Sequence, residues 1–145
     1  MKLSRESRYA LVGLSVLASK PPGTVVQLAL LAEEAELPAP FLSKIFQRLT
    51  RHGILSSFRG RQRGYALARP PREITVREVL EAVDGQDLFE RCIFVTETCD
   101  ACNPCPLHDT WTPLIASILD EMSKATLADL AVEAAEAAEA VEAAD

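Results

Sequence analysis

The chain has 145 residues, of which 48% are hydrophobic and 25% charged, and its formal net charge at pH 7 is −6. This length and apolar fraction predict one compact unit with a normal core, and the longest nearly apolar run near the start, residues 10–18, is too short to span a bilayer. We find no signal-peptide pattern and therefore expect a reducing, cytoplasmic location, where cysteines more often bind metals or act in redox reactions than form structural disulfides.

The charges are divided unevenly along the chain. Residues 1–77 carry 13 Lys or Arg against 5 Asp or Glu, a balance of +8, whereas residues 78–145 carry 2 against 16, a balance of −14. A basic half of this kind favours a polyanionic partner, although a polar surface without a partner would show the same asymmetry.

The basic half begins with three expected helices. Ser4 can cap a helix over residues 5–19, and Thr24 with Gln27 indicates a capping box for a second helix over residues 26–35. A third helix is expected to follow the turn at residues 37–40 and to end at Gly53.

The expected third helix has two distinct faces. Its apolar residues recur at the spacing of a buried stripe, namely Leu42, Ile45, Phe46 and Leu49. Its other face is polar and cationic without an acid, and consists of Ser43, Lys44, Gln47, Arg48 and Arg51. Two helices joined by a tight turn, the second with this outer face, predict a helix-turn-helix that reads the major groove of double-stranded DNA.

A hairpin is expected to follow the helix-turn-helix. Two strand-like segments, residues 54–58 and 65–68, flank a loop that contains Arg59, Arg61 and Arg63. This pattern predicts a β-hairpin with a cationic tip, or wing, that can reach the minor groove or the DNA backbone. Any one of these arginines could equally contact phosphate or be solvated, but residues 41–72 together hold eight Lys or Arg and no acid.

The second half predicts two further helices around a loop. Thr75 with Glu78 indicates a capping box for a helix that ends before Gly85, and residues 86–106 show no periodicity. A long helix over residues 106–132 is then expected, about 40 Å in length, with the acidic Ala/Glu tail 133–145 frayed or disordered. The apolar stripe of this helix favours packing against a second copy of the chain, the alternative being an ordinary core helix. The stripe consists of Trp111, Leu114, Ile115, Ile118, Leu119 and Met122.

All four cysteines of the chain lie within fourteen residues: Cys92, Cys99, Cys102 and Cys105. Four thiolates suit an iron–sulfur cluster, a structural zinc ion or a metal-free thiol switch, and the single compact group mildly disfavours zinc. Cys105 at a helix start would have a lowered thiol pKa, and His108 would lie one turn further on the same side, as a ligand or in a supporting role. An enzyme that used Cys105 and His108 as nucleophile and base would lack a recognisable oxyanion-hole motif.

Several motifs in combination carry a family resemblance over about residues 1–125. They are Ser7–Leu11, Leu42–Leu49, Gly53–Gly60, Gly64–Leu67, Ile74–Val79, Ala82–Gly85 and Cys105–His108. This order of parts resembles the Rrf-type bacterial winged-helix regulators, the group that includes IscR, NsrR and RirA. The resemblance implies a homodimer joined through the long C-terminal helix and an iron–sulfur cluster held by three cysteines and one further ligand.

The resemblance also implies residue roles. Cys92, Cys99 and Cys105 match the three cysteine ligands, and His108 matches the fourth ligand of IscR-like members. Arg8 stands where NsrR-like members have an acidic ligand, and Cys102 is an additional thiol that could replace His108. The wing, which usually has two glycines before its tyrosine, has Arg63 and Gly64 here.

The sequence therefore predicts a mainly α-helical fold with a small β-hairpin. We expect a winged helix-turn-helix over residues 1–85, a cysteine-rich cluster-binding loop over 86–106, a dimerisation helix over 107–132 and an acidic tail over 133–145. The predicted function is that of a dimeric DNA-binding transcription regulator whose operator affinity is set by a 2Fe–2S or 4Fe–4S cluster that senses iron, oxygen or nitric oxide. The alternative is a regulator with a cysteine redox switch or a structural zinc ion.

Overall fold

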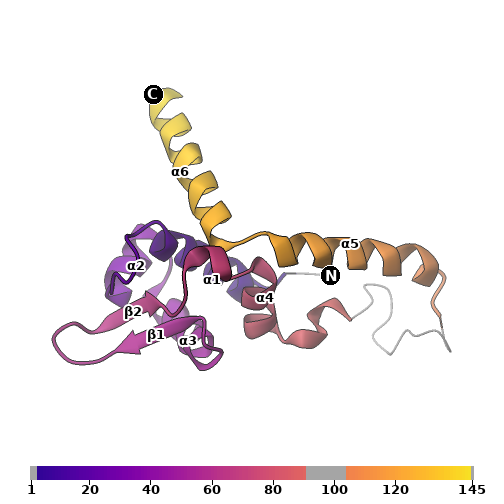
Figure 1. Cartoon of the computed structure of the whole chain (residues 1–145), viewed down its shortest axis with the longest axis horizontal. Coiled ribbons are helices and arrows are strands. Elements are labelled where there is room, and N and C mark those ends of the chain that lie inside the picture. Colours follow the sequence, from indigo (N-terminus) through magenta and orange to yellow (C-terminus); the bar gives the residue numbers. More distant parts are fainter. Residues whose placement is uncertain (1–2, 91–103, 145) are drawn as a thin grey trace.

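The computed structural model describes residues 3–90 and 104–144. The elements follow in the order α1 (Arg5–Ala18), α2 (Leu28–Glu34), α3 (Ala39–Arg51), β1 (Leu55–Phe58), β2 (Gly64–Leu67), η1 (Pro71–Glu73), α4 (Val76–Asp84), η2 (Gln86–Phe89), α5 (His108–Lys124) and α6 (Leu127–Ala144). The predicted class, mainly helical with one small hairpin, is confirmed (Figure 1). No helix within the described ranges is long and apolar enough to cross a membrane.

The first four α-helices surround one hydrophobic core. The apolar stripe of α3 lies inside it, and each of its four side chains is at most 2% exposed. Gly13 allows α1 to approach α3 closely, because a Cβ atom at this position would lie 2.9 Å from Leu42 Cδ1. Phe46 packs edge-on against Tyr65 of β2 with ring centroids 5.3 Å apart, which joins the hairpin to α3.

The hairpin is tied to the start of α2 as well. β1 and β2 pair antiparallel, and Val26 forms a bridge with Tyr65 in which each backbone N–H donates to the other residue's carbonyl at 2.9 Å. The predicted capping box at Thr24 and Gln27 is therefore wrong. Thr24 donates its hydroxyl to the Pro21 carbonyl, and α2 begins only at Leu28, because Val26 pairs with the hairpin.

The predicted capping box of α4 is confirmed. The Thr75 hydroxyl accepts from the Glu78 N–H at 3.2 Å, and the Glu78 carboxylate accepts from the Thr75 N–H at 2.9 Å. Arg69 also donates to Glu78 at 2.7 Å. Burial raises the pKa of Glu78, but the hydrogen bonds from Thr75 and Arg69 and the charge of Arg69 outweigh it, and the pKa lies below its ordinary value.

This pKa shift predicts a specific pH dependence. The folded-state pKa of Glu78 lies below the ordinary value of 4.5, so the carboxylate stabilises the fold above that pH and its contribution is lost as the pH falls through the folded-state pKa. Glu78→Gln is therefore expected to flatten the fall in Tm between about pH 5 and pH 3. Thermal unfolding across this range measures it, with Glu73→Gln at an exposed glutamate as the charge-matched control. Equal slopes for the two variants would contradict this role of Glu78.

The prediction of one long helix over residues 106–132 is wrong. α5 ends at Lys124, and α6 begins at Leu127. The helix is interrupted between them because the backbone pairs with another segment. The Ala125 carbonyl accepts from the Val76 N–H at 2.9 Å, and the Leu127 N–H donates to the Ile74 carbonyl at 3.0 Å. α5 also begins later than expected, since its first residue is His108. Residues 86–89, which were expected to belong to a loop, form the short helix η2.

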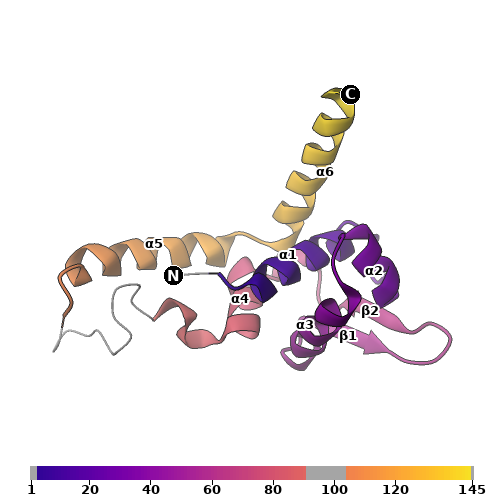
Figure 2. The ribbon, with the colours of Figure 1, turned by 180° about the vertical axis from the view of Figure 1, so that it is seen from behind.

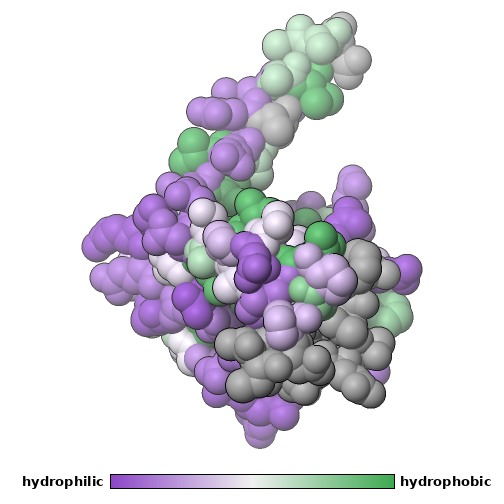
Figure 3. Space-filling view, turned by 90° about the vertical axis from the view of Figure 1, so that its right-hand side faces the viewer, coloured by the Kyte–Doolittle hydropathy of each residue, from purple (hydrophilic) through white to green (hydrophobic). Residues whose placement is uncertain are grey.

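α6 includes most of the acidic tail. The tail was expected to be frayed or disordered, but α6 continues to Ala144. We refer to α1–α4 and the hairpin as the head. The first turn of α6 is anchored on the head by Leu127, which is fully buried, and the rest of α6 projects away beside α1 (Figure 2). Figure 3 shows apolar and polar side chains alternating along this projecting helix, on which Val132 and Val141 are exposed.

Candidate nucleic-acid interface and metal centre

An open groove of about 910 Å³ lies between α3 and the wing. The start of α2 closes one end of it. Its polar and cationic lining residues are Gln27, Gln47, Thr50, Arg51, Ser57, Arg59 and Arg63. The hairpin projects from the helical body beside this groove (Figure 1), so helix and wing can approach one ligand from two sides.

The outer face of α3 presents most of the residues expected to read DNA. Lys44, Gln47 and Arg51 are exposed, and Ser43 is half-buried. Gln47 donates its amide N–H to the Ser43 hydroxyl at 3.2 Å, which orients the amide along the helix surface. Within residues 3–90 and 104–144, no salt bridge involves Lys44 or Arg51, so both charges remain available to an anion.

Arg48 differs from its neighbours on α3. Its Nη1 atom donates to the Glu6 carboxylate at 2.9 Å and to the Val83 carbonyl at 2.7 Å. These partners belong to α1 and α4. Arg48, like Ser43 and Lys44, is not among the residues that line the groove. Arg48 is therefore bound to neighbouring helices of the same chain, whereas Lys44 and Arg51 are exposed.

The wing supplies the second cationic surface. Arg59, Arg61 and Arg63 are all exposed, and the described part of the chain holds no acid in salt-bridge contact with them. Phe58, which the sequence analysis did not single out, is 45% exposed and lines the groove beside Arg59. Its place at the end of a strand, next to the loop, was the available signal.

Gly64 determines how the wing is held. A Cβ atom at this position would lie 2.3 Å from the Val26 carbonyl oxygen and 2.6 Å from the carbonyl carbon. Real Cβ atoms do not approach backbone so closely, so only glycine allows β2 to lie against the Val26 segment. The position matches the glycine before the wing tyrosine in the family motif.

Of the candidate metal ligands, the structure describes Cys105 and His108. Cys92, Cys99 and Cys102 lie outside the described residues. The His108 N–H donates to the Cys105 carbonyl at 3.0 Å, so the two residues span one turn that leads into α5, of which His108 is the first residue. Cys105 thus lies three positions before α5, whereas the expected helix began directly after it at residue 106.

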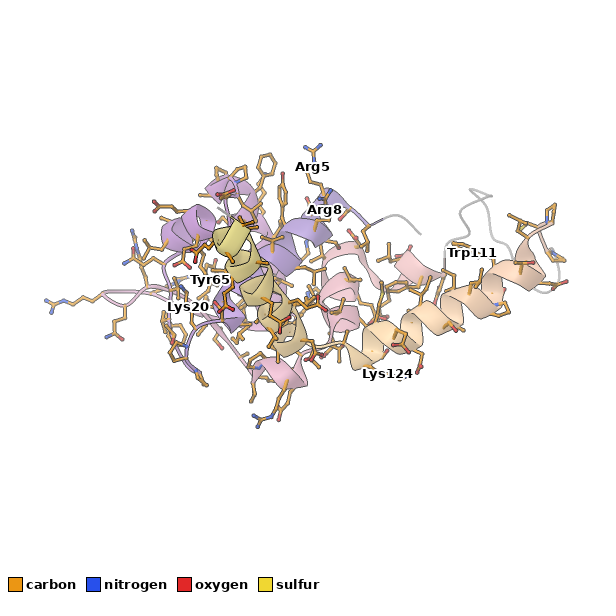
Figure 4. All side chains as sticks on the ribbon, turned by 90° about the horizontal axis from the view of Figure 1, so that it is seen from above. Arg5, Arg8, Lys20, Tyr65, Trp111 and Lys124 are labelled. Carbon is orange, nitrogen blue, oxygen red and sulfur yellow. The ribbon has the colours of Figure 1, made fainter. Side chains whose placement is uncertain are left out.

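The chemistry of this pair fits an iron–sulfur cluster. Both side chains are half-buried, and a thiolate with a nearby imidazole belongs to the ligand set that such clusters accept. Within the described ranges no three His, Cys, Asp or Glu residues form a metal-binding group. Arg8, which stands where NsrR-like proteins have an acidic ligand, is exposed on α1 (Figure 4).

The apolar stripe of α5 divides into two faces. Trp111, Ile115, Leu119 and Met122 pack with Val76, Leu80 and Phe89 in a second core cluster of the same chain. Leu114, by contrast, is 52% exposed, and Leu107 and the half-buried Ile118 lie on the same flank of the helix. α5 extends away from the first core (Figure 1), and the exposure of Leu107 and Leu114 leaves this flank open to solvent.

Comparison with known proteins identifies the family. Residues 3–133 match the family model Rrf2, described as an iron-dependent transcriptional regulator. The chain is 32% identical over 131 residues to an HTH-type transcriptional regulator of Aquifex aeolicus, and the match covers 89% of this chain and 90% of that protein. These relatives are transcriptional regulators rather than enzymes.

Solved structures agree with this assignment. IscR of T. potens superposes with a TM-score of 0.72 at 28% identity, over 94% of this chain and 90% of that one. CymR, the global cysteine regulator of B. subtilis, superposes with a TM-score of 0.76 over 92% of this chain and 98% of that one, and at 23% identity it supports the fold alone. With the groove, the wing and the family model together, the chain belongs to the Rrf2 family of winged-helix, DNA-binding transcriptional regulators.

Proposed function

We propose that this protein is a dimeric transcription regulator whose affinity for operator DNA is set by an iron–sulfur cluster, and that it acts in the cytoplasm. The observation that supports this most is the pairing of an exposed cationic groove on the head with a thiol–imidazole turn at the start of α5. The first has the chemistry of a DNA interface, and the second has the chemistry of a metal site.

The DNA contacts would come from two elements. Gln47 can pair with adenine, while Lys44 and Arg51 can contact guanine or phosphate, and Ser43 can hydrogen-bond to either. The wing residues Arg59, Arg61 and Arg63 would contact the backbone or an adjacent minor groove.

The cluster ligands would be Cys92, Cys99 and Cys105, with His108 or Cys102 as the fourth. A bound cluster would make the protein sensitive to iron supply, oxygen or nitric oxide. The turn at the start of α5 would hold Cys105 and His108 together for it. The family description as an iron-dependent regulator and the structural match to an IscR support this proposal.

The dimer would form through the outer flank of α5. Leu107, Leu114 and Ile118 leave an apolar surface on a helix that projects from the head, and a second copy of the same helix would cover it. A two-fold dimer would place two α3 helices at the spacing of two half-sites, about one turn of DNA apart.

A thiol switch without metal is the second candidate. It is favoured by the four closely spaced cysteines and by the match at 26% identity to CymR of Staphylococcus aureus, which has been solved in an oxidised form. A structural zinc ion is the other alternative for the same residues.

Anaerobic purification tests the proposal. The protein is expected to be brown, to contain iron and acid-labile sulfide, and to bind a duplex selected from a randomised pool with a different affinity after the cluster is removed. Equal affinities of the two forms would reject the switch. A colourless protein with stoichiometric zinc, or one whose DNA affinity changes only with thiol oxidation, would favour an alternative.

A further inference from the structure

Polar contacts join the ends of three helices on the side of the head where α1, α3 and α4 meet. Arg48 lies in the last turn of α3, Glu6 in the first turn of α1 and Val83 in the last turn of α4. The Arg48 guanidinium donates hydrogen bonds to the Glu6 carboxylate at 2.9 Å and to the Val83 carbonyl at 2.7 Å. One side chain of the recognition helix therefore reaches two neighbouring helices.

A second set of contacts closes the same junction. Asp84, the last residue of α4, accepts a hydrogen bond from the Ser7 hydroxyl at 2.7 Å and from the Ser4 N–H at 3.3 Å. Ser7 is fully buried. We refer to Glu6, Ser7, Arg48, Val83 and Asp84 as the helix-end latch.

The latch agrees with the electrostatics of helix ends. The Val83 carbonyl is one of the last four of α4, which have no partner within their own helix, and a cation there is favoured by the helix dipole. Glu6 and Asp84 place negative charge at the amino-terminal end of α1, where it is also favoured. Each charge thus stabilises a helix end as well as its partner.

We infer that Arg48 is a positioning residue, which fixes the orientation of α3 through the latch and does not itself contact DNA. Both hydrogens of its Nη1 atom are used, one by a carboxylate and one by a helix-terminal carbonyl, so the guanidinium cannot turn away toward a phosphate without giving up these two hydrogen bonds. Lys44 and Arg51 on the same helix are exposed and need break no ion pair in the described part of the chain.

The position of the latch gives it a regulatory role, and this step rests on the proposed function. Cys92 follows Asp84 by only eight positions in the chain. A change at Cys92 can be passed along the backbone through η2 to the end of α4, and Arg48 joins that end to α3. On the proposed function, the latch would connect the state of the cysteines to the presentation of α3.

Glu6→Ala tests the inference because the two roles of Arg48 predict opposite signs. If Arg48 positions α3, removal of Glu6 weakens binding to a duplex selected by the wild-type protein from a randomised pool, about tenfold, as Arg48→Ala does. If Arg48 contacts DNA, removal of Glu6 frees the guanidinium and tightens binding. Tighter or unchanged binding by Glu6→Ala overturns the inference.

The salt dependence of binding supplies a second readout. Lys44→Ala, the matched control, is expected to lower the slope of log K against log salt by about 1, as loss of one phosphate contact does. Glu6→Ala and Arg48→Ala are expected to leave that slope unchanged and to retain wild-type affinity for a scrambled duplex of the same length. A slope lowered by Arg48→Ala overturns the inference, and so does an equal loss on both duplexes, which indicates loss of folded protein.

The regulatory step is measured on the same variants with and without the cluster. The difference in affinity between the two forms is expected to shrink in Glu6→Ala. If the wild-type protein shows no such difference, the proposed function fails while the positioning role of Arg48 stands on the salt and affinity data. If the wild type shows the difference and Glu6→Ala retains it in full, the regulatory role of the latch fails alone.

Discussion

Replacement of Gly64 with alanine is expected to destabilise the head by about 3 kcal/mol and to lower Tm by roughly 10 °C. The added Cβ atom would meet the Val26 carbonyl at 2.3 Å, and the atoms in its way are backbone, which cannot rotate aside. To make room, β2 must move away from Val26 and give up the two 2.9 Å hydrogen bonds of the Val26–Tyr65 bridge. Since the wing forms one wall of the groove, we expect DNA binding to weaken too.

Gly60→Ala is the matched control for this prediction. Gly60 lies in the same hairpin and also has a positive φ, of 89°, but a Cβ atom there would meet nothing within 4 Å. Its replacement carries only the conformational penalty of a left-handed residue, about 1 kcal/mol. Thermal unfolding and DNA titration of both variants measure the difference. Equal losses of stability would show that the contact with Val26 does not decide the fold of the wing.

Local sequence patterns were enough to predict the elements that depend on residues close together in the chain. The stripe on α3 and the capping box at Thr75 were predictable because their partners lie within one or two helical turns, and both are present in the structure. The hairpin over residues 55–67 was predictable for the same reason, since its two strands are close in the chain.

Long-range pairing explains where the sequence predictions failed. The Thr24 capping box does not form because Val26 instead pairs with Tyr65, 39 positions away in the chain. The continuous helix over 106–132 does not form because residues 125–127 make backbone hydrogen bonds with Ile74 and Val76 instead. A local signal for this second break did exist, because Thr126 and Asp129 form a reciprocal cap in which the Asp129 carboxylate accepts from the Thr126 N–H at 2.8 Å and the Thr126 hydroxyl accepts from the Asp129 N–H at 3.4 Å. The apolar stripe that continues to Met122 nevertheless favoured an uninterrupted helix.

Arg48 illustrates that helical spacing alone does not reveal long-range contacts. Helical spacing placed Arg48 beside Lys44 and Gln47, and all three do lie on α3. Spacing could not reveal that Glu6, 42 positions away, and the carbonyl of Val83 bind its guanidinium. A residue's type and its place on a helix predict what it is able to contact, whereas the contacts that it makes depend on helices that fold against it.

Leu114→Glu is expected to convert the proposed dimer into a monomer and to weaken specific DNA binding by about 100-fold or more. Leu114 is 52% exposed on the outer flank of α5, and in a two-fold dimer the change would place a carboxylate in the interface from each copy. Separate heads would lose the fixed spacing of the two α3 helices, so each would bind one half-site alone. The fold of the head should persist, because the residues of α5 that pack on it lie on the other face.

Ala116→Glu supplies the matched control, as it adds the same charge at an exposed position two residues along α5, on the opposite flank. Sedimentation should give twice the chain mass of 15.8 kDa for the wild type and for Ala116→Glu, and the single chain mass for Leu114→Glu. A helical circular dichroism spectrum and a cooperative thermal unfolding transition for Leu114→Glu would show that the monomer remains folded. A wild-type protein that sediments as a monomer, or a Leu114→Glu variant that remains dimeric, would exclude this flank of α5 as the subunit contact.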